Sequence, residues 1–65
     1  MTIIIKRYIT SETDRDLVAY LDDKEIARIS YSISLNRTKG IFDAETEIEE
    51  AVVEKFPQHL IEFDY

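Results

Sequence analysis

The pattern of hydrophobic and polar positions predicts β-strands over most of the chain. Residues 2–9 are rich in β-branched and aromatic side chains and predict a first strand. Residues 16–21 predict a second strand, and residues 22–23 predict a tight hairpin turn, although the glycine that such turns favour is missing. Residues 25–35 alternate with a period of two, which predicts a third strand with one apolar and one polar face.

A single helix follows a polar loop that holds the only glycine. We expect this helix to begin near Asp43, whose side chain suits the cap of a helix N-terminus, and to end before Pro57. At about 100° per residue, its apolar positions share one face: Ala44, Ile48, Ala51, Val52 and Phe56. Residues 59–65 alternate again and predict a last strand.

The order of these elements predicts a single α+β domain over residues 1–65, with the order β-β-β-α-β. We expect two layers, in which the helix packs on one face of a mostly antiparallel sheet. The first three strands should form a meander, and the last strand, which returns after the helix, should pair parallel to an earlier strand. A domain of 65 residues hides only about 60% of its unfolded surface, so its stability margin is thin.

The second face of the sheet has no covering layer in this arrangement. Neighbouring strand residues point to opposite faces, so Ile4 cannot share a face with Ile3 and Ile5. We expect four apolar or aromatic side chains to lie on this open face: Ile4, Tyr8, Val18 and Tyr20. They are interpreted either as tolerated surface residues or as an interface for a partner or for a second copy of the chain, because tyrosines are favoured at interfaces.

The charge of the chain is negative and unevenly distributed. Fourteen Asp and Glu stand against eight Lys and Arg, a net charge of −6, and residues 41–65 hold eight of the acids and only one base, Lys55. Direct binding of nucleic acid or of an anionic membrane surface is disfavoured, since both need a basic surface, whereas basic partners are favoured. The chain has no cysteine and no apolar run long enough for a membrane span or a signal peptide, so we expect a cytoplasmic protein.

Few residues could carry catalysis or bind a metal. The serines Ser30, Ser32 and Ser34 share one strand face without the sharp turn of a nucleophile elbow, so they are interpreted as a solvated face or a hydroxyl surface for a partner. His59, the only histidine, is interpreted as structural or exposed. The carboxylates of residues 43–47 lack the glycine and the spacing of a calcium loop. We therefore expect no enzymatic activity, no metal and no cofactor.

The acidic residues of the helix are the main candidate site. Four of them lie within a band of about 60° opposite the apolar face and form what we call the acidic ridge: Asp43, Glu47, Glu50 and Glu54. Like charges at these spacings destabilise a helix by about 0.2–0.5 kcal/mol each, and Lys55 is the only base nearby. The ridge is therefore either a solvated face kept for solubility or a recognition surface.

The spacing of the acidic ridge favours a hypothesis about function. Successive carboxylates are about 4.5–6 Å apart along the helix axis, which is broadly similar to phosphates along a nucleic-acid strand. The chain is similar in size and charge to small acidic inhibitors encoded by phages and mobile elements. We expect a non-catalytic binding protein whose ridge engages a basic, nucleic-acid-binding surface of a target, with Val53 or Tyr65 as apolar anchors. The alternative is a self-assembling module that forms a homodimer through the open sheet face.

Residues 17–65 also resemble part of the GNAT acetyltransferase core. The hairpin LVAYLDDKEIARISYSI is similar to the central strands of that family, and residues 37–40 (RTKG) are similar to the R-x-x-G that begins its acetyl-CoA loop. The chain departs from the family at Phe42, which stands in place of a second small residue, and it lacks the first two helices. Asp43 and the acids after it would repel a pyrophosphate at the helix start. The resemblance implies a third hypothesis, a degenerate acetyl-CoA-binding remnant of the fold.

Overall fold

The fold is taken from a computed structural model that describes residues 1–33 and 41–65, with the side chains of the second range described from residue 43 onward. Its elements are β1 (Thr2–Ile9), β2 (Asp14–Leu21), β3 (Lys24–Ser32), α1 (Ile41–Lys55) and β4 (Leu60–Asp64). This is the expected β-β-β-α-β order. Within the described residues, no helix combines the length and the apolar character that crossing a bilayer requires.

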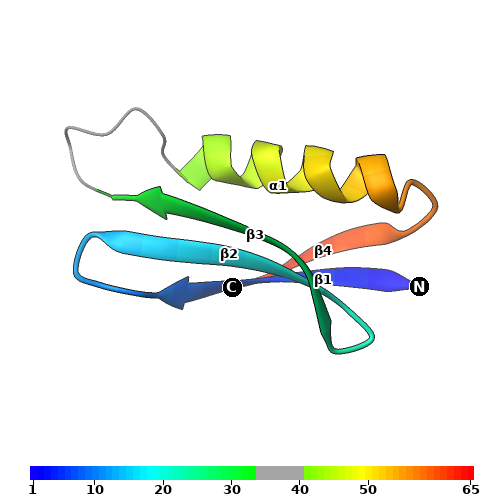
Figure 1. Cartoon of the computed structure of the whole chain (residues 1–65), viewed down its shortest axis with the longest axis horizontal. Coiled ribbons are helices and arrows are strands. Elements are labelled where there is room, and N and C mark those ends of the chain that lie inside the picture. Colours follow the sequence, from blue (N-terminus) through cyan, green and yellow to red (C-terminus); the bar gives the residue numbers. More distant parts are fainter. Residues whose placement is uncertain (34–40) are drawn as a thin grey trace.

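The four strands form one mixed sheet with the order β3-β2-β1-β4. β1 and β2 pair antiparallel, as do β2 and β3, so the expected meander is confirmed. β4 returns after the helix and pairs parallel to β1, which confirms the expected parallel strand. In Figure 1 the helix α1 lies along one face of the sheet, and no described element crosses the other face. The two-layer α+β architecture is therefore as expected.

The connection between β2 and β3 is the predicted two-residue turn. Asp22 and Asp23 have φ values of 52° and 67°, the left-handed conformation that a type I′ hairpin turn requires at both central positions. Aspartate tolerates this region better than most residues because its short polar side chain can bond locally. The register shifts after the first two residue pairs beyond the turn, since Tyr20 lies opposite Glu25 whereas Ala19 lies opposite Ala27.

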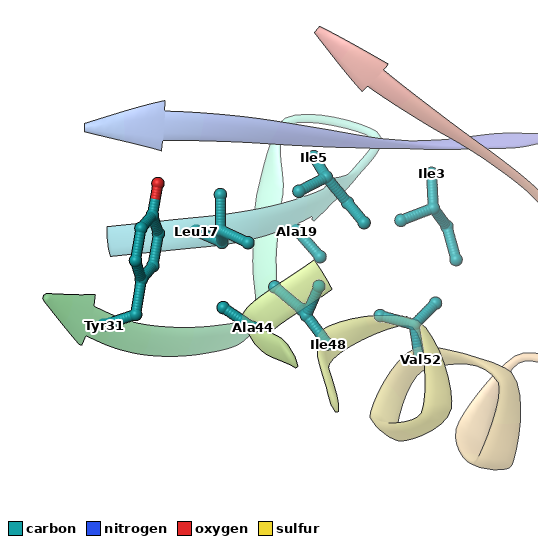
Figure 2. Close-up of a cluster of buried hydrophobic side chains, with 8 residues drawn as sticks. All are labelled: Ile3, Ile5, Leu17, Ala19, Tyr31, Ala44, Ile48 and Val52. Carbon is teal, nitrogen blue, oxygen red and sulfur yellow. The ribbon is translucent and has the colours of Figure 1, made fainter. Parts of the chain in front are cut away.

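The hydrophobic core lies between the sheet and the helix. Figure 2 shows side chains from both layers pointing toward one another. The cluster consists of Ile3, Ile5, Leu17, Ala19 and Tyr31 from the sheet and Ala44, Ile48 and Val52 from the helix. Ile48 is fully buried, and removing one such side chain from water stabilises the fold by about 1.5–3 kcal/mol. The apolar face expected for the helix is therefore the face that packs on the sheet.

Several element boundaries differ from the expected ones. The helix begins at Ile41, so Asp43 does not cap it but lies in its first turn, where a negative charge still complements the helix dipole. β2 begins two residues earlier than expected, at Asp14, and β4 lacks the residues expected at its two ends. β3 ends at Ser32, and Ile33 is 53% exposed instead of continuing the apolar face. Leu35, expected to end that strand, lies outside the described residues.

Candidate functional site

All four residues of the acidic ridge lie on the solvent-exposed part of α1. The exposed residues are Asp43, Glu47, Glu50 and Glu54. Their spacing over three helical turns follows from the helix that runs without interruption from Ile41 to Lys55. No ion pair between the described residues includes Asp43, Glu50 or Glu54. The ridge therefore presents negative charge to the solvent along the length of the helix.

The arginines of the sheet are engaged away from the ridge. Arg28 binds two carboxylates of the sheet, with an Nη1–Oδ2 distance of 2.6 Å to Asp16 and an Nη2–Oε1 distance of 2.9 Å to Glu25. Arg15 donates from Nη1 to two backbone carbonyl oxygens, each 2.8 Å away. Arg7 lies over an aromatic ring, with its guanidinium carbon 5.1 Å from the ring centroid. These three arginines are therefore held by groups other than Asp43, Glu50 and Glu54.

The first turns of the helix also contact the end of the chain. The hydroxyl of Tyr65 donates a hydrogen bond to Oε2 of Glu45. The same ring receives the guanidinium of Arg7 on its face and meets Phe63 edge to face, with ring centroids 5.9 Å apart. Burial raises the pKa of the Tyr65 phenol, and the hydrogen bond to the Glu45 carboxylate raises this pKa further. Glu45 is thus a structural acid of the helix, unlike the residues of the ridge.

The open face of the sheet carries a linked pair of tyrosines. The hydroxyls of Tyr8 and Tyr20 are 2.9 Å apart, and the hydrogen bond between them is the main cause of a raised pKa for Tyr20. In the β1–β2 register, Lys6 and Val18 face each other between the rows that hold the two tyrosines. The pair therefore spans Val18, which is fully buried.

These positions change the interpretation of the four open-face residues. Tyr8 is 41% exposed, and Ile4 and Tyr20 are half-buried, so these three side chains reach the surface. Val18 has no exposed surface and cannot contact a second copy of the chain without rearrangement. The apolar area that the open face offers for self-association is thus smaller than the sequence suggests.

A groove of about 750 Å³ lies on this open face. It is lined by Thr2, Ile4, Lys6, Tyr8, Tyr20, Asp22, Asp23, Glu62 and Asp64. Its apolar and aromatic lining comes from β1 and β2, and its carboxylates come from β4 and from the turn between β2 and β3. Sequence reasoning missed this groove, because the pairing of β4 beside β1 is what brings Glu62 and Asp64 next to the tyrosines.

The two described serines of the row differ, because Ser30 is exposed whereas Ser32 is buried. Ser30 lies opposite Asp16 in the β2–β3 register and donates a hydrogen bond of 2.7 Å to its Oδ1. Ser32 is buried and donates to the backbone carbonyl oxygen of Thr13 at 3.0 Å. Ser34 lies outside the described residues. The interpretation of these serines as solvated or partner-facing is therefore wrong for Ser32, whose hydroxyl satisfies a backbone group inside the protein.

His59 packs as a structural residue in the turn before β4. Its ring meets Phe56 edge to face with centroids 5.7 Å apart, and its backbone N–H donates to the carbonyl oxygen of Phe56 at 3.2 Å. Its Nδ1 is buried and has no hydrogen-bond partner among the described residues. Among the described residues, no group of three or more His, Cys, Asp or Glu side chains is placed to hold a metal ion.

Residues 37–40, which carry the resemblance to the acetyl-CoA loop, lie outside the described residues. The helix that follows them has exposed acids in its first two turns, Asp43 and Glu47, which oppose an anionic cofactor at that end. Comparison of the whole chain with models of protein families, with curated proteins and with solved structures found no match.

Proposed function

We propose that this chain is a small acidic, non-catalytic binding protein whose acidic ridge engages a basic surface of a target protein. The observation that carries this proposal is the exposure of Asp43, Glu50 and Glu54 along one helix, while the ion pairs that join two described residues all involve Arg28. Carboxylates about 4.5–6 Å apart along the helix axis have a spacing broadly similar to that of phosphates along a nucleic-acid strand. The target is accordingly a nucleic-acid-binding protein, and the chain acts as its inhibitor or regulator, of the kind that phages and mobile elements encode.

Electrostatic attraction supplies speed and orientation in such a complex, whereas apolar contacts supply most of the lasting affinity. Two exposed apolar side chains are available near the helix. Val53 is 47% exposed and lies on α1 itself, and Tyr65 is 46% exposed and is held against the first turns of α1 by its bond to Glu45. Glu45 lies on the flank of α1 opposite the ridge, so Tyr65 is remote from it, whereas Val53 lies on the side of α1 between Glu45 and the ridge. A target at the ridge would therefore contact a negative surface with Val53 as the nearer apolar side chain.

The experiment is affinity capture from the native host with the wild-type chain and two variants that change the charge equally. The ridge variant carries Glu50→Lys and Glu54→Lys. The control carries Glu12→Lys and Glu49→Lys, two exposed positions outside the ridge. We expect the wild type and the control to capture the same basic protein, and the ridge variant to lose it. Captured target should be released by added DNA or by salt raised above about 0.3 M, where the screening length falls to a few ångströms.

The proposal fails if the ridge variant, shown by circular dichroism to be folded, binds the purified target as tightly as the control does. It also fails if both variants lose binding equally, because net charge alone would then explain the association. A captured protein without a basic surface, or one that DNA does not displace, contradicts the nucleic-acid-binding target specifically.

A further inference from the structure

We propose that the groove on the open sheet face is a second docking site, and that its occupant is an extended, arginine- or lysine-bearing segment of a partner protein. The proposal does not depend on the acidic ridge, because α1 packs on the opposite face of the sheet. It follows from the shape, the lining and the charge of a sheet face that no described element covers.

The length of the groove suits an extended peptide. Its lining includes every second residue of β1 from Thr2 to Tyr8. A strand rises about 3.3 Å per residue, so this row is about 20 Å long and matches about six residues of an extended segment. A volume of about 750 Å³ is large enough for several side chains of such a segment. A single small ion would leave most of it unfilled.

The charges around the groove select a basic occupant. Asp22 and Asp23 contribute carboxylates on one side and Glu62 and Asp64 on the other, against one cation in the lining, Lys6. Between the described residues no ion pair joins Lys6 to any of them, since the ion pairs found there all involve Arg28. The lining therefore keeps a net negative charge, which attracts a cationic segment and disfavours a second copy of the same acidic face.

The tyrosine pair supplies the apolar part of the contact. Tyr8 is partly exposed and is held in place by its hydroxyl bond to Tyr20, so little side-chain freedom is lost when a partner binds. Aromatic faces attract arginine and lysine side chains through cation–π contacts, and carboxylates on both sides can bind the charged ends of those side chains. Carboxylates beside tyrosines therefore favour an arginine- or lysine-bearing segment over a purely apolar one.

The test uses a defined probe, a fluorescently labelled hexapeptide in which arginine alternates with threonine, and a matched peptide with glutamine in place of arginine. We expect saturable binding of the arginine peptide only. The amide chemical-shift changes that this peptide causes in the protein should be confined to residues 2–8, 20–23 and 60–64. Glu62→Gln with Asp64→Asn should weaken binding about tenfold, because two charge pairs at a groove rim are lost. Asp43→Asn with Glu50→Gln removes the same charge from the ridge and should change binding by less than about twofold.

Several results would overturn the docking site. Equal weakening by the two charge-matched variants would show a response to net charge only. Shift changes along α1 would place the peptide on the ridge. Equal binding of the glutamine peptide, or no saturation, would remove the selectivity that the lining implies. A concentration-dependent dimer in sedimentation equilibrium that Tyr8→Arg abolishes would show that the open face binds a second copy instead. None of these results bears on the capture experiment, which varies only helix positions and Glu12.

Discussion

The guanidinium of Arg28 and the carboxylate of Asp16 are 2.6 Å apart across the β2–β3 hairpin, and this ion pair lies at the centre of the polar contacts on the open sheet face. Asp16 is only 7% exposed and also accepts the hydroxyl hydrogen of Ser30. The hydrogen bond from Ser30 lowers the pKa of Asp16 most, and the hydrogen bond and the charge of Arg28 lower this pKa further, against the opposing effect of burial. The carboxylate is thus stabilised in its charged form by the folded state.

Replacing Asp16 by asparagine should destabilise the fold by about 1–2 kcal/mol at neutral pH, because a charge-assisted hydrogen bond to Arg28 is lost at a buried position. The folded-state pKa lies below the ordinary value of 3.8, so the wild type holds this contribution above that pH and loses it as the pH falls further. The difference in unfolding free energy between wild type and Asp16→Asn should therefore shrink below about pH 4. Urea denaturation at several pH values measures it.

The matched control for this pair is Asp14→Asn, which removes the same charge from an exposed position of the same strand. It should change the unfolding free energy by no more than about 0.5 kcal/mol. A pH-independent difference for Asp16→Asn, or equal effects of the two substitutions, would show that the ion pair does not stabilise the fold in the way described.

The hydrophobic pattern was enough to predict the element order and the layer that carries the core. The period of two in β3 and the helical period in α1 each select one face, and the faces that they select are the ones that meet in the core. The ends of the elements were less accurate. Asp43 has the side chain of a cap residue, yet the helix begins at Ile41, since acids are also favourable inside a first turn.

The register of the hairpin was not predicted, and it decides which polar groups meet. A regular ladder that starts from the turn at Asp22 and Asp23 would place Asp16 opposite Ile29, a polar residue beside an apolar one. The irregularity between Ala19 and Tyr20 shifts the register by one residue, so Asp16 lies opposite Ser30. The sequence did contain a signal for this shift. Without it, the apolar residues of β2 and those of β3 would point to opposite faces of the sheet, whereas the shift brings them to the same face.

The candidate sites differ in how far the sequence could define them. The acidic ridge depends on one helical period and is therefore visible in a linear pattern. The groove combines residues from β1, β4 and the β2–β3 turn, which are distant in sequence. Its carboxylates become neighbours of the tyrosines only because β4 crosses to the far edge of the sheet, and that choice of edge has no local signal in the sequence.

Truncating Ile48 to alanine should destabilise the domain by about 2–5 kcal/mol, because the side chain is fully buried between sheet and helix and its removal leaves a cavity. A 65-residue domain has a small total stability, so this variant should be largely unfolded at physiological temperature. Val53→Ala, on the exposed side of the same helix, is the matched control and should cost less than about 1 kcal/mol. Circular dichroism during thermal unfolding measures both, and similar losses for the two variants would contradict the described core.

The left-handed turn offers a stabilising change. Asp22 and Asp23 both have positive φ, where asparagine and glycine are the preferred residues of a type I′ turn. Asp22→Asn with Asp23→Gly should therefore stabilise the hairpin by about 1 kcal/mol, measured as a higher urea midpoint at unchanged slope. Asp22→Ala with Asp23→Ala removes the same two charges but keeps the unfavourable backbone positions, so it should not stabilise. A gain from the alanine pair equal to that from Asn-Gly would assign the effect to charge removal instead of backbone conformation.

Removing the hydroxyl of Tyr65 should change stability in a pH-dependent way. Tyr65→Phe keeps the ring beside Arg7 and Phe63 but loses the hydrogen bond to Glu45, which should cost about 0.5 kcal/mol at neutral pH because the site is partly exposed. The folded-state pKa of Tyr65 lies above its ordinary value of 10.0, mainly through burial. Its contribution is therefore complete below about pH 10 and decreases as the pH rises toward the folded-state pKa, so the difference between wild type and Tyr65→Phe should become smaller and then reverse in sign. Chemical denaturation from neutral to alkaline pH, with tyrosinate absorbance recorded in parallel, measures this. A difference that stays constant above pH 10 would show that this phenol titrates alike in the folded and unfolded chain.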